Sequence, residues 1–128
     1  MNPVIEAIKS RRSIRKMKPD PPLTREQVEM IIEAAVWAPN HYLTEPWRFV
    51  VLMGDERAKL GEAMSTALLA TSSPTPEQLD NERNRPLNAS VVIALISSPK
   101  SNLKIVPQEE MIAAGAALQN MLLAAHSL

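Results

Sequence analysis

Residues 38–47, APNHYLTEPW, connect a helical sequence pattern to a strand pattern. Proline disfavours helical backbone at the residue before it, so Pro39 predicts that the preceding helix ends at this loop. Residues 48–53 are apolar and partly β-branched and lead into a Gly-Asp pair, which predicts a strand and a turn. The loop offers amide, imidazole and hydroxyl groups beside aromatic side chains. It therefore suits a planar heteroaromatic ligand, or it is a connector whose tryptophans cover the core.

The other elements follow from capping residues and hydrophobic spacing. Thr24 and Gln27 form a capping box that starts the helix before the loop, and Asn2-Pro3 starts a short N-terminal helix. Residues 91–96 are a continuous apolar run, as in a central strand covered on both faces. Three more helices are predicted: one capped by Asp55, a short one over 75–85 with a Thr-Pro-x-Gln capping box, and a long Ala/Gly-rich one over 108–128 that carries Met111, Gly115, Leu118, Leu122 and Ala125 on one stripe.

Composition limits the function classes. The 128 residues fit one compact domain, and 14 Lys plus Arg balance 14 Asp plus Glu, so no overall field attracts nucleic acid or an anionic membrane. The chain has no cysteine, and its two histidines are too few for a histidine-built metal site. No apolar run reaches the ~18 residues of a membrane helix, and the N-terminus lacks a signal-peptide core. We expect a cytoplasmic protein without a metal site.

A basic cluster, Arg11-Arg12-Ser13-Ile14-Arg15, follows the N-terminal helix. Guanidinium groups match phosphate oxygens in bidentate geometry, and a serine hydroxyl adds a donor, so a phosphate monoester is the natural ligand. The alternatives are a solvated basic turn and a weak nucleic-acid contact. The phosphate hypothesis therefore needs a second element, and the loop at 38–47 supplies it.

In this order, the segments together resemble the nitroreductase-like flavoprotein family. The likeness rests on Arg-Arg-Ser with a cation two residues further on, the Ala-Pro to Pro-Trp loop leading into Arg48-Phe49-Val50-Val51, the strand over 91–96, and the helix containing Gln119-Asn120-Met121-Leu122. It implies an α+β fold with a central, mainly antiparallel sheet flanked by helices, and a long Ala/Gly-rich helix in the core or interface. It also implies a homodimer with FMN at the interface.

The resemblance further implies which residues bind FMN. Arg11 and Ser13, with Arg12 nearby, would hold the phosphate and ribityl chain, while Arg15 would reach the pyrimidine edge of the ring. A cation there stabilises the negative charge that reduction places on N1 and O2. Arg85 matches a second basic position near the same edge.

The loop would contribute from the partner subunit, where Pro39, Asn40, His41 and Thr44 would cover the ring. The common form of the family has small polar residues and a glutamine before Pro-Trp, whereas this chain has His41 and Glu45. The shorter members of the family carry a histidine at this place. Substrate range therefore does not follow from the loop.

The activity implied is that of an FMN-dependent NAD(P)H oxidoreductase, which passes a hydride through FMN to a nitroaromatic, quinone or similar electron-poor acceptor. The flavin performs the chemistry, so no catalytic side chain is assigned. Alternatives are a reductive dehalogenase, a flavin-fragmenting enzyme, or a truncated non-catalytic flavin-binding or dimerisation module. Family chains continue beyond the long helix, and here the apolar pattern reaches Leu128 without a capping glycine. We therefore expect a single domain over 1–128 that is incomplete at its C-terminus.

Overall fold

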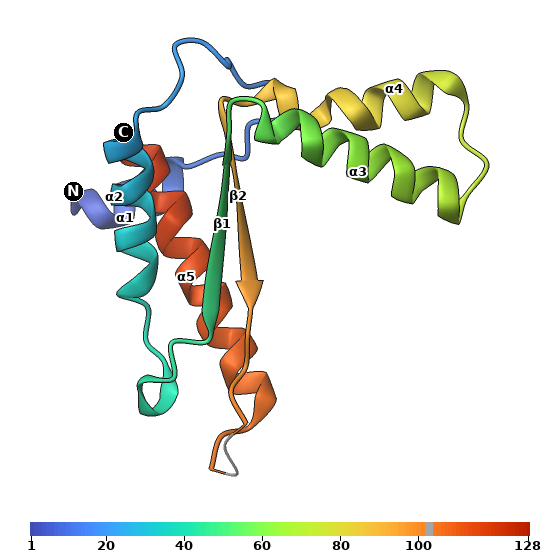
Figure 1. Cartoon of the computed structure of the whole chain (residues 1–128). Coiled ribbons are helices and arrows are strands. Elements are labelled where there is room, and N and C mark those ends of the chain that lie inside the picture. The colour runs from blue at the N-terminus through green and yellow to red at the C-terminus, as the bar shows by residue number, and fades with distance from the viewer. Residues whose placement is uncertain (102–103) are drawn as a thin grey trace. The chain divides into compact units, whose positions relative to one another are not determined.

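The computed structural model describes residues 1–101 and 104–128 (Figure 1). The two strands form an antiparallel sheet, and beyond their paired ends the Ser98 N–H donates to the Pro46 carbonyl at 2.8 Å. The composition of helices and strands confirms the α+β class. The elements follow in the order α1 (Pro3–Ser10), α2 (Arg25–Val36), the 3₁₀ turn η1 (His41–Leu43), β1 (Trp47–Met53), α3 (Glu56–Thr71), α4 (Pro76–Asn84), the 3₁₀ turn η2 (Arg85–Asn88), β2 (Val91–Ser97) and α5 (Pro107–Ser127).

The chain divides into two compact units. The first unit comprises Met1–Ser13, Thr24–Val50 and Ala94–Leu128, and the second comprises Ile14–Leu23 and Val51–Ile93. Each unit has its own internal contacts.

In the first unit, helix α2 packs along helix α5. Small side chains on α5 let the two backbones approach closely, and the Asn120 side-chain amide donates to the Ala34 carbonyl at 3.0 Å. This confirms α5 as a core helix. The buried residues are Val28, Ile31 and Ala35 on α2 and Ala113, Ala114, Ala117 and Met121 on α5, together with Ala38, Trp47 and Ile105.

The expected stripe on the long helix is not the buried face. Met111 is 68 % exposed and Leu118 is 45 % exposed, and Gly115 has nothing within 4 Å of the position its Cβ would take. Helix α5 is apolar on several sides, and the side that packs on α2 is the one that bears alanines. Met111 and Leu118 therefore lie on the exposed side, whereas Met121 is buried together with the alanines.

In the second unit, helices α3 and α4 form an antiparallel hairpin (Figure 1). Gly61 of α3 faces the backbone of α4, where an added Cβ would lie 2.0 Å from the Arg83 carbonyl oxygen. The Arg83 guanidinium pairs with Glu62 of α3 at 2.9 Å and with Asp80 at 2.7 Å, and it reaches Ser65 at 3.5 Å. A glycine is therefore what permits this close approach of the two helices.

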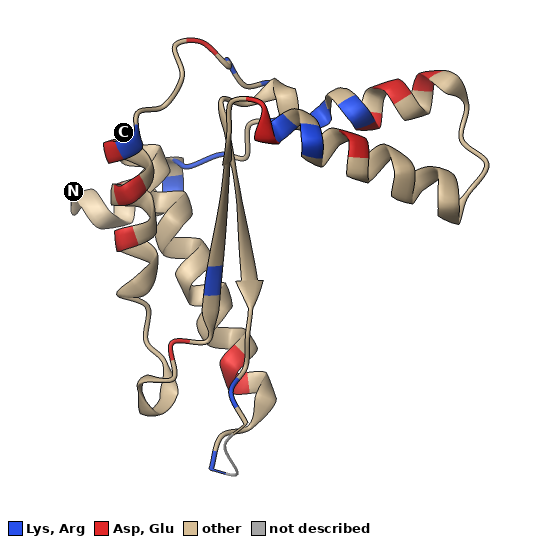
Figure 2. Cartoon of the chain, viewed as in Figure 1, with Lys and Arg blue, Asp and Glu red and all other residues tan. Residues whose placement is uncertain are grey.

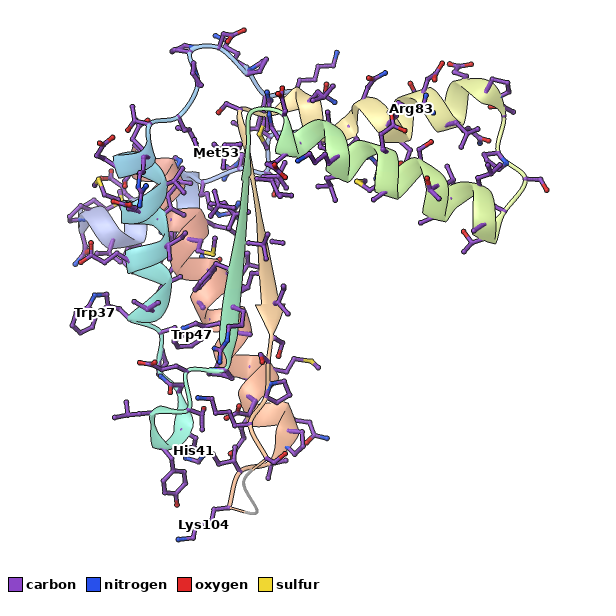
Figure 3. All side chains as sticks on the ribbon, viewed as in Figure 1. Trp37, His41, Trp47, Met53, Arg83 and Lys104 are labelled. Atoms are coloured by element: carbon purple, nitrogen blue, oxygen red, sulfur yellow. The ribbon has the colours of Figure 1, made fainter. Side chains whose placement is uncertain are left out.

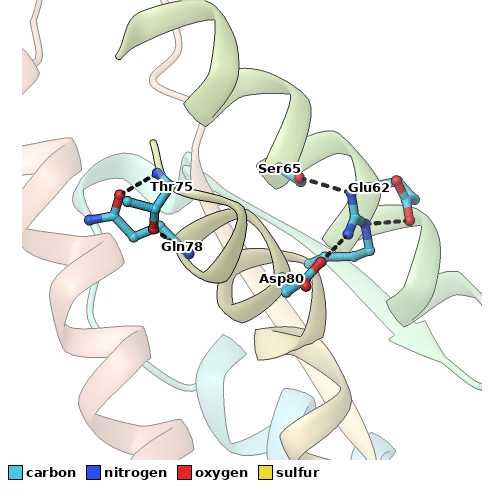
Figure 4. Close-up of polar contacts among 6 residues, drawn as sticks. Glu62, Ser65, Thr75, Gln78 and Asp80 are labelled. Carbon is cyan, nitrogen blue, oxygen red and sulfur yellow. Dashed lines mark hydrogen bonds and ion pairs between the residues drawn. The ribbon is translucent and has the colours of Figure 1, made fainter. Parts of the chain in front are cut away.

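Local capping signals were largely correct predictors of the helix starts. The Thr24–Gln27 box has both of its hydrogen bonds, as does the box that starts α4 (Figure 4), and Asn2 caps α1. Asp55 is the exception, because its backbone is already helical (φ −68°, ψ −18°) and its side chain makes no capping hydrogen bond. The expectation of a strand covered on both faces was also wrong: among the described residues, β2 pairs with β1 alone and its residues are half-buried or exposed.

Candidate functional site

Arg11 lies where helix α1 ends. Its backbone N–H donates to the Ala7 carbonyl at 3.0 Å, and its own ψ of 137° turns the chain out of the helix. The side-chain Nε is buried and has no hydrogen-bond partner among the described residues. Leaving such a donor unsatisfied costs about 1–3 kcal/mol, so an anion that accepts from it recovers that free energy. Arg11 therefore has the property expected of a phosphate ligand.

Arg12 is arranged differently. Its Nη1 donates to the Lys9 carbonyl at 2.6 Å and to the Arg11 carbonyl at 2.9 Å, so one edge of the guanidinium satisfies the C-terminal end of α1. Ser13 is exposed. Of the three predicted phosphate ligands in this unit, Arg11 is the one whose guanidinium holds a buried, unsatisfied donor.

Arg15 and Arg85 belong to the second unit, and both are exposed. Arg85 begins the turn η2, where its Nη2 pairs with Glu82 at 2.6 Å. It also lines a hollow of about 360 Å³ that includes Ser72 and Gln78. The roles of these two arginines toward a flavin stay predictions.

The loop between α2 and β1 has an uncommon backbone. Tyr42, Leu43 and Glu45 have φ values of 52°, 51° and 46°, in the left-handed region that residues other than glycine seldom adopt. Each such residue costs roughly 1 kcal/mol or more, so contacts must hold the loop in this form. One comes from Asn40, whose Oδ1 accepts from the Glu45 N–H at 2.9 Å while its Nδ2 donates to the Ala38 carbonyl.

The first turn of α5 provides two further contacts with this loop. The Thr44 hydroxyl donates to Glu110 Oε1 at 2.6 Å, and both residues are buried, at 7 % and 2 % exposure. His41 Nδ1 lies 2.7 Å from Glu109 Oε2, and both of these side chains are exposed. The acidic residues at this end of α5 can be seen in Figure 2. Thr44 is predicted to contact the cofactor. Its hydroxyl proton is donated to Glu110 within the protein, so it is not available to a ligand.

A cavity of about 340 Å³ opens between the loop and α5, on the side where Figure 3 shows His41. Its lining combines apolar side chains, including two alanines, with an amide, an imidazole and a carboxylate. A flat aromatic ring would meet apolar side chains on its face and hydrogen-bonding groups at its edge. The lining residues are Pro39, Asn40, His41, Glu109, Ile112, Ala113 and Ala116.

The structure brings three of the predicted loop residues, Pro39, Asn40 and His41, together at one cavity, and their contact with a flavin stays a prediction. Sequence reasoning missed Glu109 and Glu110. A signal for Glu110 was present, because it stands three residues before Ala113, on the apolar face of the helix. Within residues 1–101 and 104–128, no group of three or more His, Asp or Glu could hold a metal ion, and no helix is long and apolar enough to cross a membrane.

Comparisons with known proteins bear on this arrangement. The sequence model of the nitroreductase family matches residues 8–128. YdjA of Escherichia coli K12, provisionally named an NAD(P)H nitroreductase, is 30% identical over 121 residues, which cover 94% of this chain and 65% of YdjA.

Two solved structures are similar along nearly the whole chain. A protein of Desulfovibrio desulfuricans, provisionally named a nitroreductase and crystallised with FMN, has a TM-score of 0.73 and 33% identity, covering 99% of this chain and 64% of that one. A nitroreductase of Desulfitobacterium hafniense with bound FMN has a TM-score of 0.70 and 26% identity, covering 99% and 66%. The chain thus spans about 65% of the length of these three relatives.

Proposed function

This chain belongs to the nitroreductase family, and from that membership we propose that it binds FMN and serves as an NAD(P)H-dependent oxidoreductase. The acceptor class is an electron-poor small molecule such as a nitroaromatic or a quinone. When bound, FMN would supply the hydride-transfer chemistry that links the nicotinamide to that acceptor. We further propose a cytoplasmic location, which rests on the sequence reasoning alone.

The unsatisfied Nε of Arg11 is the observation that carries this proposal. The two FMN-bound structures described above are 33% and 26% identical to this chain and cover 99% of it. Phosphate oxygens are strong acceptors for guanidinium N–H groups, and FMN carries a terminal phosphate. The donor therefore fits the proposed cofactor.

The roles of the chain's own residues follow. Arg11 binds the phosphate, Ser13 adds a hydroxyl donor, and Arg12 supplies a nearby positive charge. Arg15 and Arg85 place positive charge near the pyrimidine edge, where reduction increases negative charge.

The loop over residues 38–47 forms part of the proposed site for the flavin ring. Asn40 is braced within it, so Pro39 and His41 present a preformed wall of the cavity. A wall that is already ordered binds a planar ligand without the entropic cost of ordering it.

A homodimer is the assembly we propose. Helix α1 has no buried residue, and its Val4, Ile5 and Ile8 are 60 %, 44 % and 48 % exposed. Helix α5 exposes Met111 and Ile112 by 68 % and 71 %. Apolar surface on two helices of one unit is what a stable subunit interface requires, because burying it lowers the free energy of the assembly.

The test is a sequence of three spectra of the purified protein. FMN is added and bound flavin is measured, NADH or NADPH is then added without oxygen, and a quinone follows. We expect binding, loss of the visible flavin absorption with the nicotinamide, and its return with the acceptor. Failure to bind FMN contradicts the cofactor assignment, and binding without bleaching contradicts the oxidoreductase activity.

A further inference from the structure

We propose that Glu110 is a positioning residue, which fixes the loop over residues 39–45. Residues 39–41 of this loop line the cavity, so Glu110 sets how tightly the flavin ring is held. The inference rests on the proposed function and assigns a role to a carboxylate that lies behind the cavity. Glu110 itself is not among the residues that line the cavity.

The contacts of Glu110 join three separate segments. Its Oε1 accepts from the Thr44 hydroxyl in the loop, and its Oε2 accepts from the Lys100 backbone N–H, at 3.2 Å, in the segment after β2. Glu110 is 2 % exposed, so its two carboxylate oxygens accept hydrogen bonds from protein donors and not from water. A buried carboxylate tolerates the loss of a donor poorly, which makes the arrangement well defined.

The location of Glu110 on its helix also favours a buried negative charge. It lies in the first turn of α5, whose N-cap residue, Val106, makes no side-chain capping hydrogen bond. The unpaired N–H groups at a helix N-terminus attract negative charge. The carboxylate is therefore stabilised from its own helix while it accepts from the loop.

The hydrogen bond from Thr44 to Glu110 is called the clamp below. The neighbouring pair between His41 and Glu109 cannot replace it. Its side chains are 59 % and 43 % exposed, and solvent weakens an exposed pair. Thr44, in contrast, is buried and stands between residues with left-handed backbone, Leu43 and Glu45. The one buried polar anchor of the described loop is thus the hydroxyl that donates to Glu110.

The clamp connects directly to the cavity. Ala113 lies one helical turn after Glu110 and lines the cavity, which Pro39 and His41 also line. Release of Thr44 would let the loop residues move relative to α5. The width available to a planar ring would then no longer be fixed.

Two changes test the clamp. Thr44→Val keeps the shape of the side chain and removes the hydroxyl, and Glu110→Gln places an NH₂ group where one of the two donors expects an acceptor. Thr44→Ser keeps the hydroxyl and is the rescuing variant. Thr71→Val is the matched control, because the Thr71 hydroxyl donates to the Ala67 carbonyl within α3.

The first readout needs no flavin. Hydrogen exchange of the Thr44 and Glu45 amides should accelerate roughly tenfold or more in Thr44→Val and Glu110→Gln, and stay at the wild-type rate in Thr44→Ser and Thr71→Val. Exchange across α3 and α4 serves as the internal reference for folding. Unchanged loop exchange in both clamp variants would overturn the proposal.

The second readout is the Kd for FMN and the absorption spectrum of the bound flavin. Both clamp variants should bind FMN roughly tenfold more weakly with a shifted spectrum, and the serine variant should restore both. Faster exchange with unchanged Kd and spectrum would reduce Glu110 to a purely structural residue and refute the positioning role. A wild-type protein that does not bind FMN refutes the proposed function instead, and the exchange data distinguish that case.

Discussion

Gly61→Ala gives a sharp test of the packing in the α3–α4 hairpin. The added Cβ would lie 2.0 Å from the Arg83 carbonyl oxygen and 2.9 Å from the carbonyl carbon. Neither atom is the end of a flexible side chain, so one helix must move by about 1 Å to restore ordinary contact. That displacement also lengthens the bonds from Arg83 to Glu62 and Ser65.

The magnitude follows from two opposing terms. Alanine is a better helix former than glycine by about 1 kcal/mol, whereas overpacking of this kind costs about 1–3 kcal/mol and more when backbone must shift. We expect a net loss of roughly 2 kcal/mol in the free energy of unfolding, or about 8 °C in Tm. Gly115→Ala is the matched control, because nothing lies within 4 Å of its added Cβ.

Urea unfolding followed by circular dichroism measures both variants. Gly115→Ala should be neutral or more stable by up to about 1 kcal/mol, since only helix propensity changes. If Gly61→Ala were as stable as its control, the close approach of the two helices would be wrong. A loss of stability in both variants would show instead that glycine is needed for a reason other than space.

Three further changes test other parts of the structure. Thr24→Ala removes the cap of α2 and should cost about 1 kcal/mol in urea unfolding; no loss would contradict the capping box. Hydrogen bonds from the backbone and from Thr24 lower the pKa of Glu26. The contribution of Glu26 to folding stability is therefore present above the ordinary carboxyl pKa and is lost as pH falls through the lowered value. An NMR titration midpoint equal to that of a glutamate in an unfolded chain would refute this. Ile112→Glu puts charge on the exposed apolar side of α5 and should leave a folded monomer in sedimentation velocity, and a dimer that survives the change would exclude this surface from the interface.

Helix starts could be predicted from sequence because capping is local. The side chain of Thr24 and the backbone it caps are three residues apart, so both partners of the hydrogen bond can be read from one short stretch of sequence. Asp55 resembles a cap by the same rule, but the left-handed Gly54 (φ 53°) before it leaves Asp55 in helical backbone. Its carboxylate then makes no capping bond.

The buried face of α5 could not be chosen by hydrophobicity, because large apolar residues occur on more than one side. Packing against α2 selected the small residues Ala113, Ala114 and Ala117, and left Met111 exposed. Small size, which permits close helix contact, mattered more than hydrophobic area.

The site shows the same division between local and tertiary information. The type and order of Arg11 and the loop residues were readable from the sequence. Which arginine keeps a free donor depends on Arg12 folding back onto the helix carbonyls, and the clamp at Thr44 depends on a residue 66 positions away. Helical spacing places Glu110 on the apolar face but does not identify Thr44 as its partner, and the contacts of Arg12 leave no trace in the spacing.

The most direct test of the central claim compares the binding of FMN with that of riboflavin, which lacks the phosphate. If Arg11 binds that phosphate, FMN should bind roughly 10- to 100-fold more tightly, since one or two charge-assisted hydrogen bonds are at stake. Arg11→Ala should remove most of that preference, whereas Arg25→Ala, at an exposed arginine in α2, should keep it. Equal affinity for the two flavins, or a preference that survives Arg11→Ala, would contradict the account.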